Sequence, residues 1–137
     1  ELSCELESGA IAYASTCPKA VSPKSQRKDI GEVYDRVSIS SALTYKNAIR
    51  KAVTKWWKHV SQPIGDTQII RANISKLGCS IVKCQLHYVV VCRYSPIANI
   101  AKQDDSRGDP CTECAKRNCT DPGLCSAKKT VVINIAL

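Results

Sequence analysis

The hydrophobic and polar positions along this 137-residue chain follow a helical period in two places. Between Cys4 and Cys17 apolar side chains recur near helical spacing, two glutamates stand in the first turn, and Pro18 ends the segment. The clearer pattern covers residues 41–60, where Ser40 or Ser41 is the expected cap. Basic residues lie mainly outside its apolar stripe, which consists of Tyr45, Ile49, Val53, Trp56, Trp57 and Val60. We expect both tryptophans to pack in the core, with a partner surface as the alternative.

The pattern changes to that of β-structure after the second helix. Residues 68–74 are a candidate strand, and residues 81–83 and 87–94 are predicted to form an antiparallel hairpin through a short connection at 84–86. The run of three valines at 89–91 indicates a strand that is buried on both faces. Helices are therefore expected to cover this sheet, which gives a layered α+β domain.

The composition changes again at about residue 101. Acidic residues, glycine, proline and four cysteines follow within a short span, which is typical of a loop-rich module held by disulfides. A last apolar stretch at 131–137 resembles an extra strand. We therefore expect a core over residues 1–100 and a cysteine-rich tail over residues 101–137.

The cysteine content indicates an oxidising, extracellular compartment. The odd number of cysteines leaves one unpaired or bonded outside the chain, and spacing alone does not give the pairing. Two glycosylation sequons, at Asn73 and Asn118, agree with secretion. Zinc is the alternative for the last four cysteines, because four thiolates can hold the ion tetrahedrally. The nine are Cys4, Cys17, Cys79, Cys84, Cys92, Cys111, Cys114, Cys119 and Cys125.

The net charge of +8 favours anionic partners such as phospholipid headgroups, glycosaminoglycans or nucleic acid. The alternative is a secreted protein that simply has a high isoelectric point. The basic residues lack interleaved aromatic residues, and no nucleic-acid motif is present, so a nucleic-acid partner is not expected. No apolar stretch approaches the length that a membrane helix needs.

Candidate chemistry along the chain is sparse. The two histidines, His59 and His87, form no recognisable triad or paired zinc motif. His87 is expected to be structural, and His59 either complements the helix C-terminus or lines a pocket. The tripeptide Arg107-Gly108-Asp109 matches an integrin-recognition motif, with an ordinary solvated turn as the alternative.

Two cysteine-containing segments in the predicted β-region have a distinctive sequence: Leu-Gly-Cys-Ser-Ile-Val-Lys-Cys at 77–84 and Val-Val-Cys-Arg-Tyr-Ser-Pro at 90–96. They resemble the second signature of the CAP superfamily, which contains cysteine-rich secretory, antigen 5 and pathogenesis-related proteins. Other segments resemble the family in the same order: residues 6–18 its early helix, 31–34 its Gly-Glu-Asn segment, 52–57 its central helix, and 110–114 with 123–125 the hinge of nematode activation-associated secreted, or venom allergen-like, proteins.

This resemblance implies a three-layer α-β-α sandwich with a disulfide-rich C-terminal hinge, secretion, and a role at a host or extracellular surface. It also implies a cleft in which two histidines and two glutamates can bind zinc. Here Glu32 matches one acidic position, His59 falls near the second, and Gly65-Asp66-Thr67-Gln68 replaces the usual His-aromatic-Thr-Gln. The degenerate cleft therefore keeps Glu32, His59 and Gln68. Because tight zinc binding takes three or four protein ligands, we expect no metal and no cofactor.

The family fold also begins with a long helix that has no counterpart before Cys4. No initiator methionine or signal peptide is present, so we expect a processed or N-terminally truncated chain. Absence of the helix would expose an apolar face and favour a dimer or another partner. Alternatively, the helix is cleaved and stays associated as a separate segment.

The sequence and this resemblance together predict a secreted, non-enzymatic binding protein; the resemblance implies a parasite effector that modulates immunity through host proteins or lipids. An integrin-dependent adhesion antagonist and a sterol or fatty-acid carrier are the alternatives. A metal-assisted hydrolase using Glu32 and His59 is disfavoured by the missing ligands.

Overall fold

The structure is a computed structural model that describes residues 1–60, 74–97, 109, 111, 119–120 and 124–125. The chain divides into two compact units, Glu1–Asp104 and Asp105–Leu137, and each is considered by itself. None of the described helices is long and apolar enough to cross a membrane.

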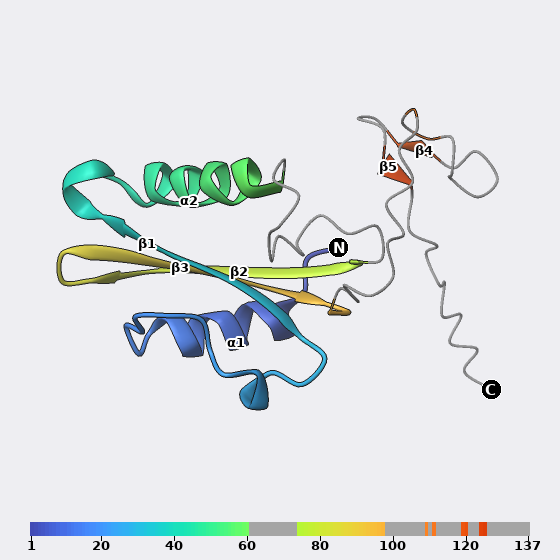
Figure 1. The fold of residues 1–137 in the computed structure, drawn as a ribbon, viewed down its shortest axis with the longest axis horizontal. Helices are drawn as coiled ribbons and strands as arrows, with labels where there is room; N and C mark the ends of the chain where they lie inside the picture. Colours follow the sequence, from blue (N-terminus) through green and yellow to red (C-terminus); the bar gives the residue numbers. More distant parts are fainter. Residues whose placement is uncertain (61–73, 98–108, 110, 112–118, 121–123, 126–137) are drawn as a thin grey trace, which may run out of the picture. The chain divides into compact units, whose positions relative to one another are not determined.

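The first unit is a three-layer α-β-α sandwich, as the sequence predicts. Its antiparallel sheet has the strand order β1-β3-β2, with one helix on each face (Figure 1). The second unit contains a small antiparallel pair. In chain order the elements are α1 (Cys4–Ala14), a 3-10 turn (Lys24–Gln26), β1 (Gly31–Ser38), a second 3-10 turn (Ile39–Ser41), α2 (Tyr45–Val60), β2 (Lys76–Cys84), β3 (His87–Ser95), β4 (Cys119–Thr120) and β5 (Leu124–Cys125).

The central strand β3 supplies the core on both faces of the sheet. Val90 and its even-numbered neighbours pack under α2, against Ala48, Ala52 and Trp56. Val89 and Val91 pack against α1 at Ala10 and Ala14. The predicted burial of the valine run on both faces is therefore confirmed.

The predicted hairpin is also confirmed, with a longer first strand than expected. Gln85 and Leu86 form the connection, and Gln85 adopts a left-handed φ of 46°. Strand β1 was not predicted, although Val33, Tyr34 and Val37 are residue types enriched in strands. The predicted strands at 68–74 and 131–137 lie outside the described residues.

The start and the buried face of α2 differ from the prediction. Ser40 and Ser41 lie in a 3-10 turn, and the side chain of Thr44 accepts the capping hydrogen bond, from the Asn47 amide at 3.2 Å. Trp56 is buried, but Trp57 is 64% exposed, so the prediction that both tryptophans lie in the core is wrong for Trp57. The sequence pattern overlooked two alanines: Ala48, Ala52 and Trp56 share one face and let the helix approach the sheet closely.

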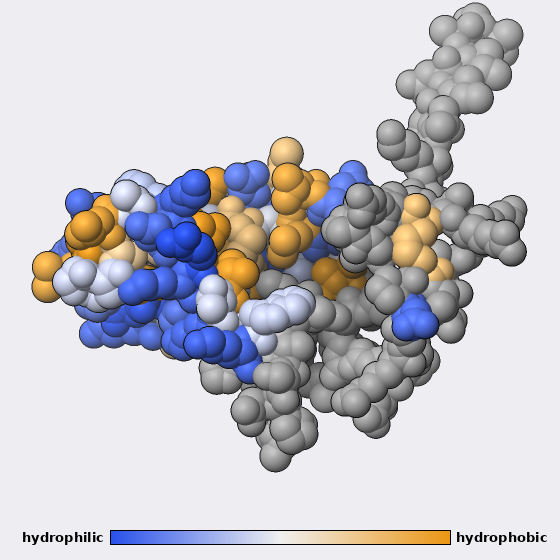
Figure 2. Space-filling view, turned by 90° about the horizontal axis from the view of Figure 1, so that it is seen from above, coloured by the Kyte–Doolittle hydropathy of each residue, from blue (hydrophilic) through white to orange (hydrophobic). Residues whose placement is uncertain are grey.

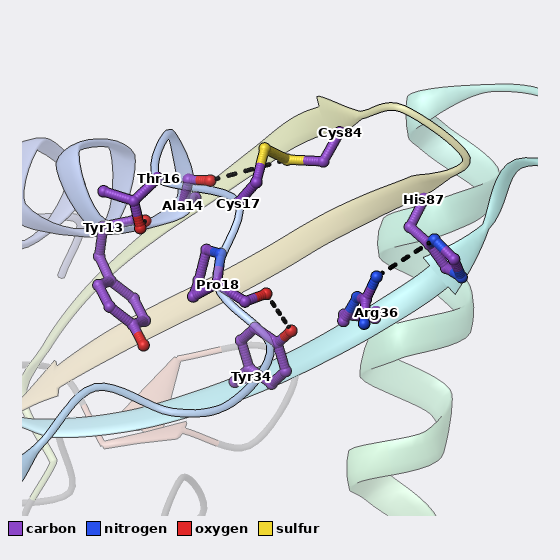
Figure 3. Close-up of a disulfide and its surroundings, with 9 residues drawn as sticks. All are labelled: Tyr13, Ala14, Thr16, Cys17, Pro18, Tyr34, Arg36, Cys84 and His87. Carbon is purple, nitrogen blue, oxygen red and sulfur yellow. Dashed lines mark hydrogen bonds between the residues drawn. A yellow bond between two sulfur atoms is a disulfide. The ribbon is translucent and has the colours of Figure 1, made fainter.

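Three disulfides join described cysteines, which confirms that these cysteines act as covalent links. Cys79 and Cys92 stand directly opposite each other on β2 and β3 and are bonded. A second bond joins Cys17, just past the end of α1, to Cys84 at the end of β2 (Figure 3). In the second unit Cys111 is bonded to Cys119, while Cys4 is an exposed free thiol.

We predict that the Cys17–Cys84 bond stabilises the fold more than the Cys79–Cys92 bond does. The first closes a sequence separation of 67 residues and the second one of 13. Because loop-closure entropy grows with loop length, alanine replacement of each pair is expected to cost about 4 and about 3 kcal/mol, respectively. Urea unfolding measures both, with Cys4→Ser as the control that leaves stability unchanged. The reverse order of the two costs would contradict this prediction.

Candidate functional site

A buried ion pair between Glu32 and Arg93 lies at one end of the sheet. The two residues stand opposite each other on β1 and β3. Arg93 Nε donates a hydrogen bond to Glu32 Oε2 at 2.8 Å, and the amide of Ser22 donates to Oε1 at 2.7 Å. The Glu32 side chain is fully buried and the Arg93 side chain is 12% exposed. Both carboxylate oxygens are therefore engaged by donors.

The guanidinium of Arg93 lies between the sheet and α1. Its central carbon lies 5.9 Å from the centre of the Tyr13 ring, within cation–π range. Gly9 of α1 leaves room for it, since a Cβ at that position would crowd the tip of the arginine. Helix α1 thus shields the ion pair from solvent, which strengthens its electrostatic attraction.

The segment between α1 and β1 is held against this ion pair by polar contacts. The hydroxyl of Tyr13 donates to the Ala20 carbonyl at 2.9 Å. The hydroxyl of Tyr34 donates to the Pro18 carbonyl at 2.7 Å, as Figure 3 shows. Arg27 donates to the Ser22 carbonyl at 3.1 Å. Together with the Ser22 amide on Glu32, these bonds fix the path of the chain over residues 18–30.

The two tyrosines titrate above their usual range. Burial is the main cause of the raised pKa of both Tyr13 and Tyr34. For Tyr13 the negative charge of Glu32 raises the pKa further, while Arg93 and Arg27 oppose it. Both phenols therefore stay protonated at neutral pH and act as hydrogen-bond donors rather than as bases.

The donor set around Glu32 does not suit a divalent metal ion. A metal would have to displace a guanidinium and a backbone amide from a carboxylate that is already neutralised. Within the described ranges, no three His, Cys, Asp or Glu residues lie close enough together to hold a metal. Ser22 is also buried, and its hydroxyl finds no hydrogen-bond partner among the described residues.

Most of the other predicted site residues lie outside the described part of the chain. His59 belongs to the last turn of α2, but its side chain lies outside the described residues, as do Gln68, Arg107, Gly108, Asn73 and Asn118. Asp109 is exposed. His87 lies at the start of β3, where its ring meets Arg36 at 3.4 Å (Figure 3).

Sequence reasoning missed Arg93 and Ser22 as parts of the site. The signal for Arg93 was present, because it shares its strand face with Val89 and Val91, and a charge on a buried face requires a partner. Ser22 acts through its backbone amide, which carries no residue-specific signal.

Comparison with known proteins identifies a family whose sequence profile matches most of this chain. The profile of the cysteine-rich secretory protein family, CAP, matches residues 1–94. A curated protein of Ancylostoma caninum, named Ancylostoma secreted protein, is 27% identical over 147 aligned residues, which cover 90% of this chain and 34% of that protein. The chain thus spans about a third of the length of this curated relative.

Several solved structures are also similar to this chain in sequence and in fold. The structure described as NaASP2 with Zn²⁺ is 28% identical and has a TM-score of 0.76; the match covers 92% of this chain and 75% of that one. The structure of BmVAL-1 is 26% identical and has a TM-score of 0.74; the match covers 90% of this chain and 73% of that one.

We predict that Arg93→Gln destabilises the protein by about 3–5 kcal/mol, because it leaves the buried Glu32 carboxylate without its counter-charge. Urea unfolding gives the free energy, and trypsin cleavage at Lys24 and Lys28 reports release of the segment over 18–30. Arg36→Gln is the matched control, since Arg36 lies on the same sheet but is exposed. Equal losses in both variants, or an unchanged cleavage rate in Arg93→Gln, would show that the ion pair does not hold this segment.

Proposed function

The chain belongs to the cysteine-rich secretory protein family, and from this premise we propose that it is a secreted, non-enzymatic binding protein. Its partners are host extracellular proteins or lipids, and its role is that of a parasite effector that modulates host immunity. Its similarity to a secreted protein of Ancylostoma caninum supports this proposal. The whole of that relative is longer, so the proposal concerns the domain in hand.

The observation that carries the non-enzymatic part is the engagement of Glu32. A general base or metal ligand needs a free lone pair facing the substrate or the ion. Glu32 is fully buried, and Arg93 and the Ser22 amide occupy its two oxygens. The carboxylate is therefore a structural anion that orders the chain around it.

The zinc named for one solved relative belongs to that relative. In this chain the guanidinium of Arg93 supplies a permanent positive charge beside Glu32. A second cation at the same carboxylate would meet Coulomb repulsion at short range, in surroundings that screen charge poorly. This arrangement supports a version of the family fold in which Arg93, rather than a metal ion, neutralises the Glu32 carboxylate.

Secretion is supported by the covalent bracing of the fold. Three disulfides link described cysteines, and structural disulfides form and persist outside the reducing cytosol. A scaffold cross-linked in this way keeps its surfaces ordered outside the cell. Binding through such surfaces requires no catalytic group.

We predict that Glu32→Gln leaves zinc binding and hydrolysis unchanged. The substitution removes the charge that a metal-assisted hydrolase would need, while the amide keeps a similar shape. Calorimetric titration with zinc chloride and assays on ester and peptide substrates compare the variant with the unmodified chain. Because the substitution leaves the buried Arg93 guanidinium without its counter-charge, the variant is expected to be less stable, and the assays are run at a temperature at which circular dichroism shows both proteins folded. A fall in zinc affinity of about tenfold or more, or loss of a hydrolytic activity, would overturn the non-enzymatic proposal.

We predict saturable binding of the labelled chain to host endothelial cells or leukocytes. Unlabelled chain competes for the sites, because binding depends on a defined folded surface. Chain that has been reduced and alkylated serves as the control and binds no better than background, since the disulfides hold the fold. Binding that does not saturate, or that survives reduction, would contradict a role as a folded binding protein.

A further inference from the structure

Helix α2 presents a strongly basic surface on the side away from the sheet. Its core side carries Ala48, Ala52 and Trp56. The helix contains no acidic residue, whereas five of its residues are basic and all five are exposed. Lys55 turns back to Asp35 of β1, so we define the outer face of α2 by the other four cations and the exposed Trp57: Lys46, Arg50, Lys51, Lys58 and Trp57.

Two exposed apolar residues, Val53 and Trp57, lie within this basic face. Lys46, Arg50, Val53 and Trp57 follow one another at intervals of four, three and four residues, so they form one ridge along the helix. Val53 is 48% exposed and Trp57 is 64% exposed. Figure 2 views the molecule from the α2 side and shows hydrophobic patches between hydrophilic ones on this surface.

Three of the five cations of α2 have no acidic partner among the described residues. Lys55 reaches Asp35 of β1 at 2.7 Å, and Arg50 donates to the Asn47 side chain at 3.1 Å. In the part of the chain that the structure describes, Lys46, Arg50 and Lys51 form no ion pair. The face therefore attracts an anion that comes from outside the molecule.

We propose that the outer face of α2 binds a sulfated polysaccharide. From Lys46 to Lys58 the cations extend over about 18 Å along the helix, which suits a linear polyanion that lies along it. The exposed indole of Trp57 offers a flat apolar surface on which a sugar ring can pack between its sulfate groups. Charge and ring together match the chemistry of such a chain.

A sulfated glycan fits the extracellular setting better than an anionic membrane does. Anionic phospholipids give the cytoplasmic leaflet its negative surface potential, which a secreted chain does not meet. The glycan proposal depends on the proposed function only because it assumes that the protein is extracellular. Its test uses purified protein and no cells, so the two proposals can fail separately.

The test compares two charge reversals of equal size. Lys46→Glu with Arg50→Glu alters the outer face of α2, while Lys24→Glu with Lys28→Glu alters exposed lysines before β1 and serves as the control. Titration with size-defined heparin oligosaccharides at physiological salt is expected to give about tenfold weaker binding, or more, for the α2 variant. The control variant is expected to bind nearly as well as the unmodified chain. Equal losses in both variants would mean that net charge alone governs binding and would overturn the proposal.

Tryptophan fluorescence provides a second readout that net charge does not produce. The chain has two tryptophans, and only Trp57 is exposed. Heparin oligosaccharides are expected to shift the emission of the unmodified chain, whereas Trp57→Phe, which leaves the buried Trp56, shows no shift. A shift that persists in Trp57→Phe contradicts contact at this ring.

Vesicles that contain phosphatidylserine provide the competing arm of the experiment. Binding to these vesicles without binding to heparin would assign the face to anionic lipid and overturn the proposal. Desulfated heparin should not bind, because the proposal requires the cations of α2 to pair with the sulfate groups of the glycan. Binding of desulfated heparin as strong as that of heparin would also overturn it.

Discussion

Burial of β3 on both of its faces is the constraint on which the rest of the structure depends. Val89, Val90 and Val91 are almost completely removed from solvent. Each buried valine side chain contributes roughly 1.5–3 kcal/mol, and this gain requires apolar cover on both sides of the strand. Helix α1 supplies that cover on one face and α2 on the other, while β1 and β2 satisfy the hydrogen bonds along the two edges of β3. The order of the three layers follows from this one strand.

The charged pair at the end of β3 is the exception to that apolar strand. Arg93 continues the face of Val89 and Val91, where an unpaired charge would cost several kcal/mol. Glu32 on the neighbouring strand neutralises it and also receives the Ser22 amide. One buried carboxylate thus joins the sheet, α1 and the segment before β1. A carboxylate that holds the fold together in this way is not free to serve as a reactive group.

The sequence predicted the layers better than the site. Alternation and valine runs identify the hairpin, because burial on one or both faces leaves a period in the sequence. The exposure of Trp57 was missed because an apolar stripe shows amphipathicity but does not show which part of it meets the sheet. Ala48 and Ala52 determine which side of α2 meets the sheet, since their small side chains let the helix approach the sheet closely. The Glu32 site depends on pairing between strands distant in sequence and on a backbone amide, and neither feature has a local pattern.

The bond between Cys17 and Cys84 also determines how the domain responds to proteases. A single cut at any peptide bond between these two residues leaves two pieces that stay covalently attached to each other. The piece that carries α1 cannot diffuse away, so its contacts with the sheet can re-form at high effective concentration. A nicked molecule would therefore keep its mass until it is reduced.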